Sequence, residues 1–290
     1  MIERAVETFQ RRRPYLVGVA YRLLGTVAEA EDAVQDTWLR LQGADTDGIE
    51  DLEAWLTVVT TRICYDQLKS ARMRREHYVG EWLPEPIVDG DPPVDPADRV
   101  TLDESVSMAL LVVLETLSPA ERTAFVLHDV FAVPFDTVAE VVGRTPAACR
   151  QLAARARAHV TERAPRFDAT GDQHRRAVDA FTHAATTGDL EHLLAVLDPE
   201  VVLHSDGGGK VPAPEVPLEG SEPVARFLLD IAAARQHMRH QVRTVNGRPG
   251  LVTTEDDRTV AVMGFEVAEG RITEIDLVMN PDKLPTELGR

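Results

Sequence analysis

The sequence lacks the features that would assign it to a secreted or membrane-bound class. It has only two cysteines, Cys64 and Cys149, which argues against a disulfide framework and leaves both as small core residues. No apolar run is long enough to span a bilayer, and residues 1–13 are charged throughout, unlike a secretory leader. We therefore expect a cytoplasmic protein with no membrane partner.

Positive charge is also in short supply. The chain has 31 Lys and Arg against 48 Asp and Glu, a formal net charge of −17. A protein this acidic is not an indiscriminate polyanion binder, so any contact with DNA must be local. The acidic surplus falls mainly in residues 79–100 and 169–290, whereas residues 1–78 and 101–168 are close to neutral. The length of 290 residues predicts two or three domains.

Residues 134–160 carry the pattern of a helix-turn-helix. Apolar residues at helical spacing end at Gly143, and Thr145 followed by Pro146 predicts the start of a second helix. One face of that helix is apolar, and the other is small and basic, which suits a major groove. The candidate DNA contacts on it are Thr145, Ala147, Arg150, Gln151, Ala154, Arg155 and Arg157. An ordinary helical hairpin with a solvated arginine face is the alternative.

Three helices are predicted in the N-terminal quarter of the chain, over about residues 6–24, from a Thr26/Glu29 capping box to Gly43, and over 52–75. The second helix leaves one set of side chains outside: Asp32, Gln35, Asp36, Leu39 and Arg40. The third becomes basic and aromatic, with Thr61, Arg62, Tyr65, Lys69, Arg72 and Arg75. Aromatic rings can stack on unpaired bases while cations neutralise phosphates. The helix dipole alone would favour some of these arginines.

Residues 79–100 are rich in proline and acidic side chains and lack periodicity, which predicts an extended linker. Such an acidic segment is suited to a basic channel, but a solvated spacer would have the same composition. Two helices are expected after it, over about residues 102–116 and 119–130. Together with the helix-turn-helix they complete a four-helix module.

The remaining residues, 170–290, predict an α+β domain. Helices are expected from residue 174 and over 190–197 and 224–233, with strands at 201–205, 239–245, 250–254, 259–267 and 271–278. Helices followed by a curled antiparallel sheet resemble the SnoaL-like (NTF2-like) cone-shaped fold, which usually encloses a pocket. The polar candidates for the inside of such a cone are His204, Asp206, His237 and Asp276. A fold alone does not supply chemistry.

Three blocks together resemble the two all-α domains of an extracytoplasmic-function RNA polymerase sigma factor. They are YRLLGTVAEAEDAVQDTWLRL (21–41), EAWLTVVTTRICYDQLKSARMRRE (53–76) and the helix-turn-helix. The resemblance implies two partners, promoter DNA and core RNA polymerase with its β′ and β subunits, and a protein that is monomeric when free. It assigns the β′ contact to the outer face of the second helix, and −10 recognition and melting to residues 44–51 and to residues 60–75 of the third helix. The helix-turn-helix would read the −35 element.

Three short strings resemble those of sigma factors with a fused SnoaL-like extension, the sigma-factor-J-like proteins. They are WLPEP (82–86), DGGGK (206–210) and NPDKL (280–284). In that group the extension is taken to replace a separate anti-sigma factor. This implies an interdomain regulatory role for Trp82, Pro84, Asp206, Gly207, Gly208, Gly209, Lys210, Asn280, Pro281, Asp282 and Lys283. A stiff spacer, a strand-end turn and a terminal turn are the local explanations.

No catalytic or metal-binding pattern accompanies these motifs. His237 and His240 are three residues apart but lack a third ligand of suitable spacing, and DGGGK does not have P-loop spacing. We expect a non-enzymatic initiation factor without cofactor or metal. Its predicted parts are residues 1–78, the linker 79–100, residues 101–165 and a regulatory domain at 170–290. For that last domain a small-molecule sensor and an isomerase or hydrolase remain as alternatives.

Overall fold

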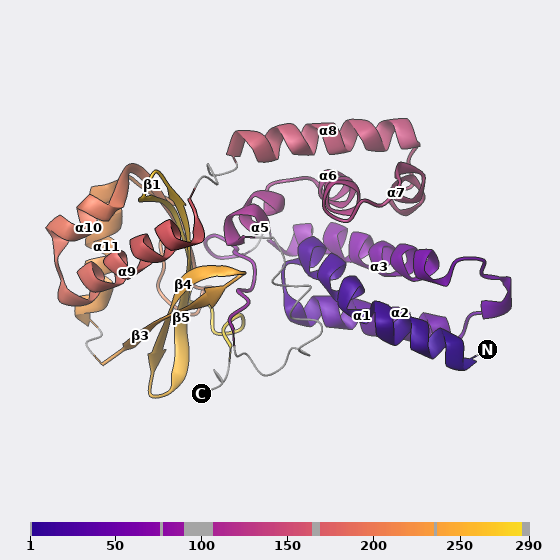
Figure 1. Cartoon of the computed structure of the whole chain (residues 1–290), viewed down its shortest axis with the longest axis horizontal. Coiled ribbons are helices and arrows are strands. Elements are labelled where there is room, and N and C mark those ends of the chain that lie inside the picture. Colours follow the sequence, from indigo (N-terminus) through magenta and orange to yellow (C-terminus); the bar gives the residue numbers. More distant parts are fainter. Residues whose placement is uncertain (1, 76–77, 90–106, 164–168, 235–236, 286–290) are drawn as a thin grey trace. The chain divides into compact units, whose positions relative to one another are not determined.

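The computed structural model describes residues 2–75, 78–89, 107–163, 169–234 and 237–285 (Figure 1). These residues divide into two compact units. The helical unit contains residues 2–75 and 113–163, and the C-terminal unit contains residues 78–89, 107–112, 169–234 and 237–285. The described part of the predicted linker, residues 79–89, therefore belongs with the C-terminal domain together with Tyr78, and residues 78–89 are called the linker from here on. Within the described residues, no helix is both long and apolar enough to cross a membrane.

The first half of the helical unit contains α1 (Ile2–Leu24), α2 (Val27–Gln42), the 3₁₀ turn η1 (Thr46–Gly48) and α3 (Leu52–Arg75). The predicted capping box is present in part, since the Thr26 hydroxyl accepts a hydrogen bond from the backbone N–H of Glu29. The first helix begins at Ile2, earlier than the apolar pattern indicated. All three helices pack on one another through their apolar stripes.

After the linker come α5 (Met108–Glu115), whose residues up to 112 group with the C-terminal unit, and then α6 (Pro119–Phe125), the π-helical turn η2 (Val126–Val130), α7 (Phe135–Val142) and α8 (Pro146–Arg163) of the helical unit. A full capping box joins Ser118 and Glu121. Gly143 ends α7 with φ +70°, which favours glycine. The helix predicted over 119–130 is correct in extent, but its second half is π-helical. The predicted start near residue 102 lies outside the described residues.

The C-terminal unit begins with α9 (Gly171–Thr187) and α10 (Leu190–Val196), and α11 (Ser221–Ala234) follows later. Its strands are β1 (Leu197–Asp206), β2 (Leu218–Glu219), β3 (Arg239–Val245), β4 (Arg248–Glu255), β5 (Arg258–Ala268) and β6 (Arg271–Val278). The sheet order is β2-β1-β6-β5-β4-β3. The prediction of an antiparallel sheet was wrong, because β1 pairs with β6 in parallel and the sheet is mixed. The short β2 was not predicted.

The two faces of this sheet have different covers. Leu203, Phe265 and Ile275 lie on the face that packs against α9, α10 and α11 in the main core. The alternate positions of β1, β5 and β6 lie on the other face, where the linker is docked, as Figure 1 shows. Val88 of the linker forms an antiparallel bridge with Val245 of β3. The middle of the sheet, in β5 and β6, is therefore buried on both faces, whereas most of β3 stays exposed or half-buried.

Candidate functional site

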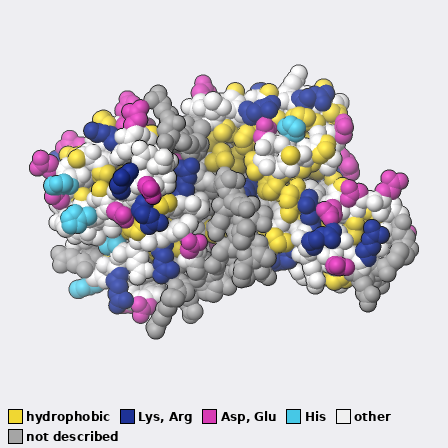
Figure 2. Space-filling model, viewed as in Figure 1, with side chains coloured by type: hydrophobic (Ala, Val, Ile, Leu, Met, Phe, Trp, Pro, Cys, Tyr) yellow, Lys and Arg dark blue, Asp and Glu magenta, His cyan; other side chains and the backbone are white. Residues whose placement is uncertain are grey.

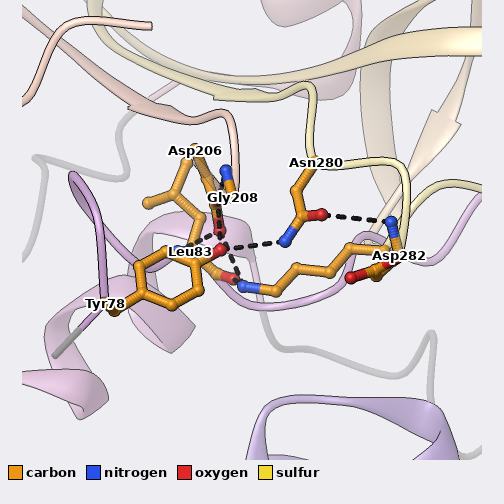
Figure 3. Close-up of polar contacts among 7 residues, drawn as sticks. Tyr78, Leu83, Asp206, Gly208, Asn280 and Asp282 are labelled. Atoms are coloured by element: carbon orange, nitrogen blue, oxygen red, sulfur yellow. Dashed lines mark hydrogen bonds and ion pairs between the residues drawn. The ribbon is translucent and has the colours of Figure 1, made fainter. Parts of the chain in front are cut away.

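Asp206, at the end of β1, is the centre of a linker clamp, which we define as Asp206, Asn280 and Lys283 with Tyr78 and Leu83 of the linker (Figure 3). The Asp206 carboxylate is fully buried. Its Oδ1 accepts a hydrogen bond from the Tyr78 hydroxyl at 2.6 Å, and its Oδ2 accepts one from the Leu83 backbone N–H at 3.0 Å. The DGGGK segment thereby holds both ends of residues 78–83.

Lys283 supplies the charge that balances Asp206. Its Nζ lies 2.6 Å from Asp206 Oδ2 and also donates to the Leu83 carbonyl at 2.6 Å. The Lys283 and Asp206 side chains are 7% and 0% exposed. Nζ also lies 3.9 Å from the ring centroid of Trp82, which is half-buried in the linker. Removing either partner of a buried ion pair of this kind destabilises the fold, because the remaining charge is left uncompensated.

Asn280 connects the NPDKL segment to the same site. Its Nδ2 donates to the Tyr78 hydroxyl at 2.8 Å, and its Oδ1 accepts from the Asp282 backbone N–H at 3.1 Å. Burial and the hydrogen bond to Asp206 raise the pKa of Tyr78 well above its usual value. Tyr78 therefore stays a neutral hydroxyl that donates to Asp206.

The glycines of DGGGK are required by close packing. Gly208 has φ +63°, and a Cβ there would lie 2.5 Å from the side chain of Asn280. A Cβ on Gly207 would lie 2.1 Å from the Val211 carbonyl oxygen. Only glycine lets the chain turn this tightly against the NPDKL segment.

The structure brings together most of the predicted interdomain residues, and it brings them to the linker. Pro84 is buried beside this site, whereas Pro281 is exposed. Lys210 and Asp282 form an ion pair at 2.6 Å with both side chains more than half exposed, outside the clamp. Sequence reasoning missed Tyr78 and Leu83, because no local pattern shows which linker residues meet a carboxylate more than 120 positions away.

The polar residues predicted to line a cone do not do so. His204 and Asp276 are register partners on the linker-covered face of the sheet, His237 is exposed, and Asp206 belongs to the clamp. His204 and Asp276 do not reach the helix-covered face because side chains alternate between the two faces along a strand. A bulge where β6 pairs with Glu266 and Val267 of β5 shifts which residues of β6 point to each face.

A small apolar pocket of about 50 Å³ lies on the helix-covered face instead. It is lined by side chains from α9, α11 and four strands, including Phe181, Leu228, Met263 and Met279. Its polar contribution comes from His240 and Thr253, whose Nδ1 and Oγ1 atoms are 3.0 Å apart, and from Thr186. Burial lowers the pKa of His240, which favours the neutral ring. None of its described lining residues is a carboxylate.

The predicted DNA and polymerase surfaces lie on the helical unit. On α8, Arg150, Gln151 and the other five predicted −35 residues are exposed, while Cys149, Leu152 and Ala156 are buried. Figure 2 shows basic side chains along α8 at the top of the view. On α2, all five predicted polymerase-binding residues are exposed: Asp32, Gln35, Asp36, Leu39 and Arg40. The two faces match the predicted division between buried and exposed positions.

The residues predicted to contact the −10 element differ in their exposure. Thr61 is fully buried and donates to the Thr57 carbonyl at 2.6 Å, so its side chain is not accessible to DNA in this structure. Tyr65 is partly exposed and carries Lys69 Nζ 3.9 Å from its ring centroid. The side chains of Arg72 and Arg75 lie outside the described part of the chain. Thr61 lies three residues before Cys64 and seven before Leu68, which are also buried, so helical spacing indicated this face although threonine is common on either face.

Arg62 joins the two helical modules. Its Nη2 donates to the Glu140 side chain at 3.1 Å and to the Glu140 carbonyl at 3.2 Å, linking α3 to α7. Phe131 also stacks edge-on against Tyr15 of α1, with ring centroids 5.1 Å apart. In this arrangement a predicted −10 residue is engaged by the helix-turn-helix module.

Comparisons with known proteins cover both units. Residues 8–74 match the model of Sigma-70 region 2, and residues 107–160 match that of Sigma-70, region 4. The chain is 42% identical to the ECF RNA polymerase sigma factor SigJ of Mycobacterium tuberculosis, over 96% of this chain and 92% of that one. It is 38% identical to the probable ECF RNA polymerase sigma factor SigI of the same species, over 97% and 96%. The crystal structure of the M. tuberculosis extracytoplasmic function sigma factor SigJ aligns with a TM-score of 0.76 at 39% identity, covering 96% of this chain and 97% of that one.

Proposed function

Because the chain belongs to the extracytoplasmic-function (ECF) RNA polymerase sigma factors, we propose that it directs the polymerase to promoters under the control of its own C-terminal domain. The observation that supports this control is the clamp on the linker. A buried lysine and a buried aspartate hold residues 78–83, which connect the two modules along the chain.

Within the helical unit, each surface has a proposed partner. The outer face of α2 docks on the β′ subunit, where its carboxylates meet basic side chains and Leu39, 55% exposed, supplies an apolar contact. Arg62, Tyr65 and Lys69 hold the melted −10 strand by charge and stacking. The exposed face of α8 reads the −35 element as duplex.

Docking of the linker limits how the two modules can be arranged. A chain segment fixed to a folded domain cannot contribute to the span between the modules, so clamping residues 78–83 shortens the flexible connection. The Arg62–Glu140 contact has to open before Arg62 can bind DNA. We propose that the clamped form restrains promoter binding and that release of the linker permits it.

The test is promoter-directed transcription with purified core enzyme. We expect Lys283→Met to raise transcription at least ~threefold. Removing one partner of a buried ion pair costs about 3–5 kcal/mol, which corresponds to more than a tenfold change in the equilibrium between docked and released linker. The control is Lys210→Met, which removes the exposed Lys210–Asp282 pair of the neighbouring segment and should have little effect. The double variant Asp206→Asn/Lys283→Met removes both buried charges and separates release of the linker from loss of folding. Equal activity in all variants would disprove regulation by the clamp while leaving the sigma function intact.

The apolar pocket supports a second candidate, a small-molecule sensor. Met279 lines the pocket, and its backbone N–H donates to the Asp206 carbonyl at 2.8 Å, so an occupant would act on the end of β6 next to the clamp. The pocket is about a third of the ~150 Å³ cavity that holds benzene, so a small aromatic molecule with one polar group for His240 would enter it only as the flexible Met263 and Met279 side chains move. We expect p-cresol to raise the melting temperature of the full chain more than toluene does, and Ala261→Leu to abolish the effect. An enzyme gains no support, because the acids with strongly raised pKa values lie on the other face.

A further inference from the structure

A second set of polar residues holds the linker on the sheet, apart from the clamp. Six ionisable side chains lie together on the linker-covered face and form what we call the charged cluster. They are Glu81 of the linker, His204 of β1, Arg248 of β4, Glu266 of β5, and Glu274 and Asp276 of β6. Strand register places them together, since His204 is opposite Asp276, and Glu274 is opposite Glu266.

Glu81 is the member that the linker contributes. Its Oε1 is 2.9 Å from His204 Nδ1, and its Oε2 accepts the Ser205 backbone N–H at 3.3 Å. His204 Nε2 faces Glu274 at 3.9 Å on its other side. The imidazole is therefore bracketed by one carboxylate from the linker and one from the sheet, an arrangement that suits a protonated ring with two donors.

The rest of the cluster has more negative than positive charge. Arg248 pairs with Glu266 at 2.8 Å, so four carboxylates share one arginine and one histidine. Asp276 is 1% exposed, and no described residue donates a hydrogen bond to its Oδ1. Buried carboxylates in excess of their cations must bind protons, because an uncompensated charge is unfavourable away from water. Within the described residues, no group of three or more acidic, histidine or cysteine side chains could hold a metal ion.

From this arrangement we propose that the linker docks on the sheet together with bound protons, so that acidity tightens the docked state and alkalinity loosens it. The geometry that carries the proposal is a linker carboxylate resting on an imidazole within a buried, acid-rich cluster. Its effect on transcription depends on the function proposed above, but the docking itself can be measured without polymerase.

The direction follows from the groups that face one another. Burial lowers the pKa of His204, but the hydrogen bond to Glu81 and the charges of Asp276, Glu81 and Glu274 outweigh it and raise the value from 6.5 to about 9. Docking is thus fully stabilised by the charged ring below pH 6.5 and loses that contribution as the pH rises towards 9. Burial raises the pKa of Glu266 to about 7 despite Arg248, and burial also raises those of Glu274 and Asp276. Ionisation of these acids acts in the same direction.

Hydrogen exchange of the full chain tests the proposal. The measurement is amide protection of residues 78–89 at pH 6 and pH 9, corrected for intrinsic exchange. We expect protection to fall by about tenfold or more at pH 9. The change in the His204 pKa from 6.5 to about 9 sets a ceiling of roughly 300-fold on this loss. Part of the change in pKa comes from sheet residues that remain in place when the linker leaves, and so the ceiling is not reached.

Two variants and one control make the test specific. Glu81→Gln keeps the shape of the linker contact and should weaken protection at pH 6 and reduce its pH dependence to about twofold. His204→Gln should do the same if the domain stays folded. The control is His192→Gln, which removes an exposed histidine paired with Asp189 elsewhere in the same unit and should behave like wild type. Protection that is equal at both pH values in the wild type, or unchanged pH dependence in Glu81→Gln, would overturn the proposal.

Discussion

The two units hold their neighbouring segments with contrasting ion pairs. In the C-terminal unit the Lys283–Asp206 pair holds the linker with side chains that are 7% and 0% exposed. In the helical unit the Arg62–Glu140 pair joins the two modules with side chains that are 47% and 55% exposed. A solvated pair contributes little and opens readily, whereas a buried pair cannot lose one partner without a large penalty. The comparison indicates that linker docking is firm and that the Arg62–Glu140 pair opens readily.

The largest effect should come from breaking the buried pair. We expect Lys283→Met to lower the free energy of unfolding of the C-terminal unit by about 3–5 kcal/mol, since Asp206 is left buried and unpaired. Chemical denaturation with circular dichroism measures this. Asp206→Asn/Lys283→Met should recover a substantial part of the loss, because no buried charge remains. A loss below about 1 kcal/mol for the single variant would show that the pair is not the firm contact described here.

A smaller effect is expected at the glycine that allows Asn280 to approach. Gly208→Ala should cost about 2 kcal/mol or more, because φ is +63° and the new Cβ would lie 2.5 Å from the Asn280 side chain. Gly188→Ala is a matched control, with φ +71° and nothing within 4 Å of its Cβ, and should cost about 1 kcal/mol. Equal losses in thermal denaturation would indicate that backbone strain, and not the contact with the NPDKL segment, selects glycine at position 208.

The smallest effect belongs to the exposed pair. We expect Glu140→Gln to change the stability of the helical unit by less than about 1 kcal/mol. Its effect should instead appear in binding, since a freed Arg62 is available to phosphates, and affinity for single-stranded −10 DNA should rise a few-fold at low salt. Asp136→Gln, on the same helix, is the control for a general loss of negative charge. A destabilisation as large as that of Lys283→Met would remove the contrast between the two units.

Local patterns in the sequence determined the helices, their caps and their buried faces, because periodicity and capping act over a few residues. This is why the division of α8 into a buried stripe and an exposed basic face, and the Ser118 capping box, could be predicted. The motif strings likewise predict an interdomain role for Asp206, Asn280 and Lys283.

Tertiary structure alone decided which surfaces these residues serve. The parallel pairing of β1 with β6 and a bulge in the sheet place His204 and Asp276 under the linker, not inside the cone. Tyr78, Leu83 and Glu81 meet residues more than 120 positions away. These outcomes depend on long-range packing, which no local pattern encodes, because a contact's energy depends on the partner that folding brings to it.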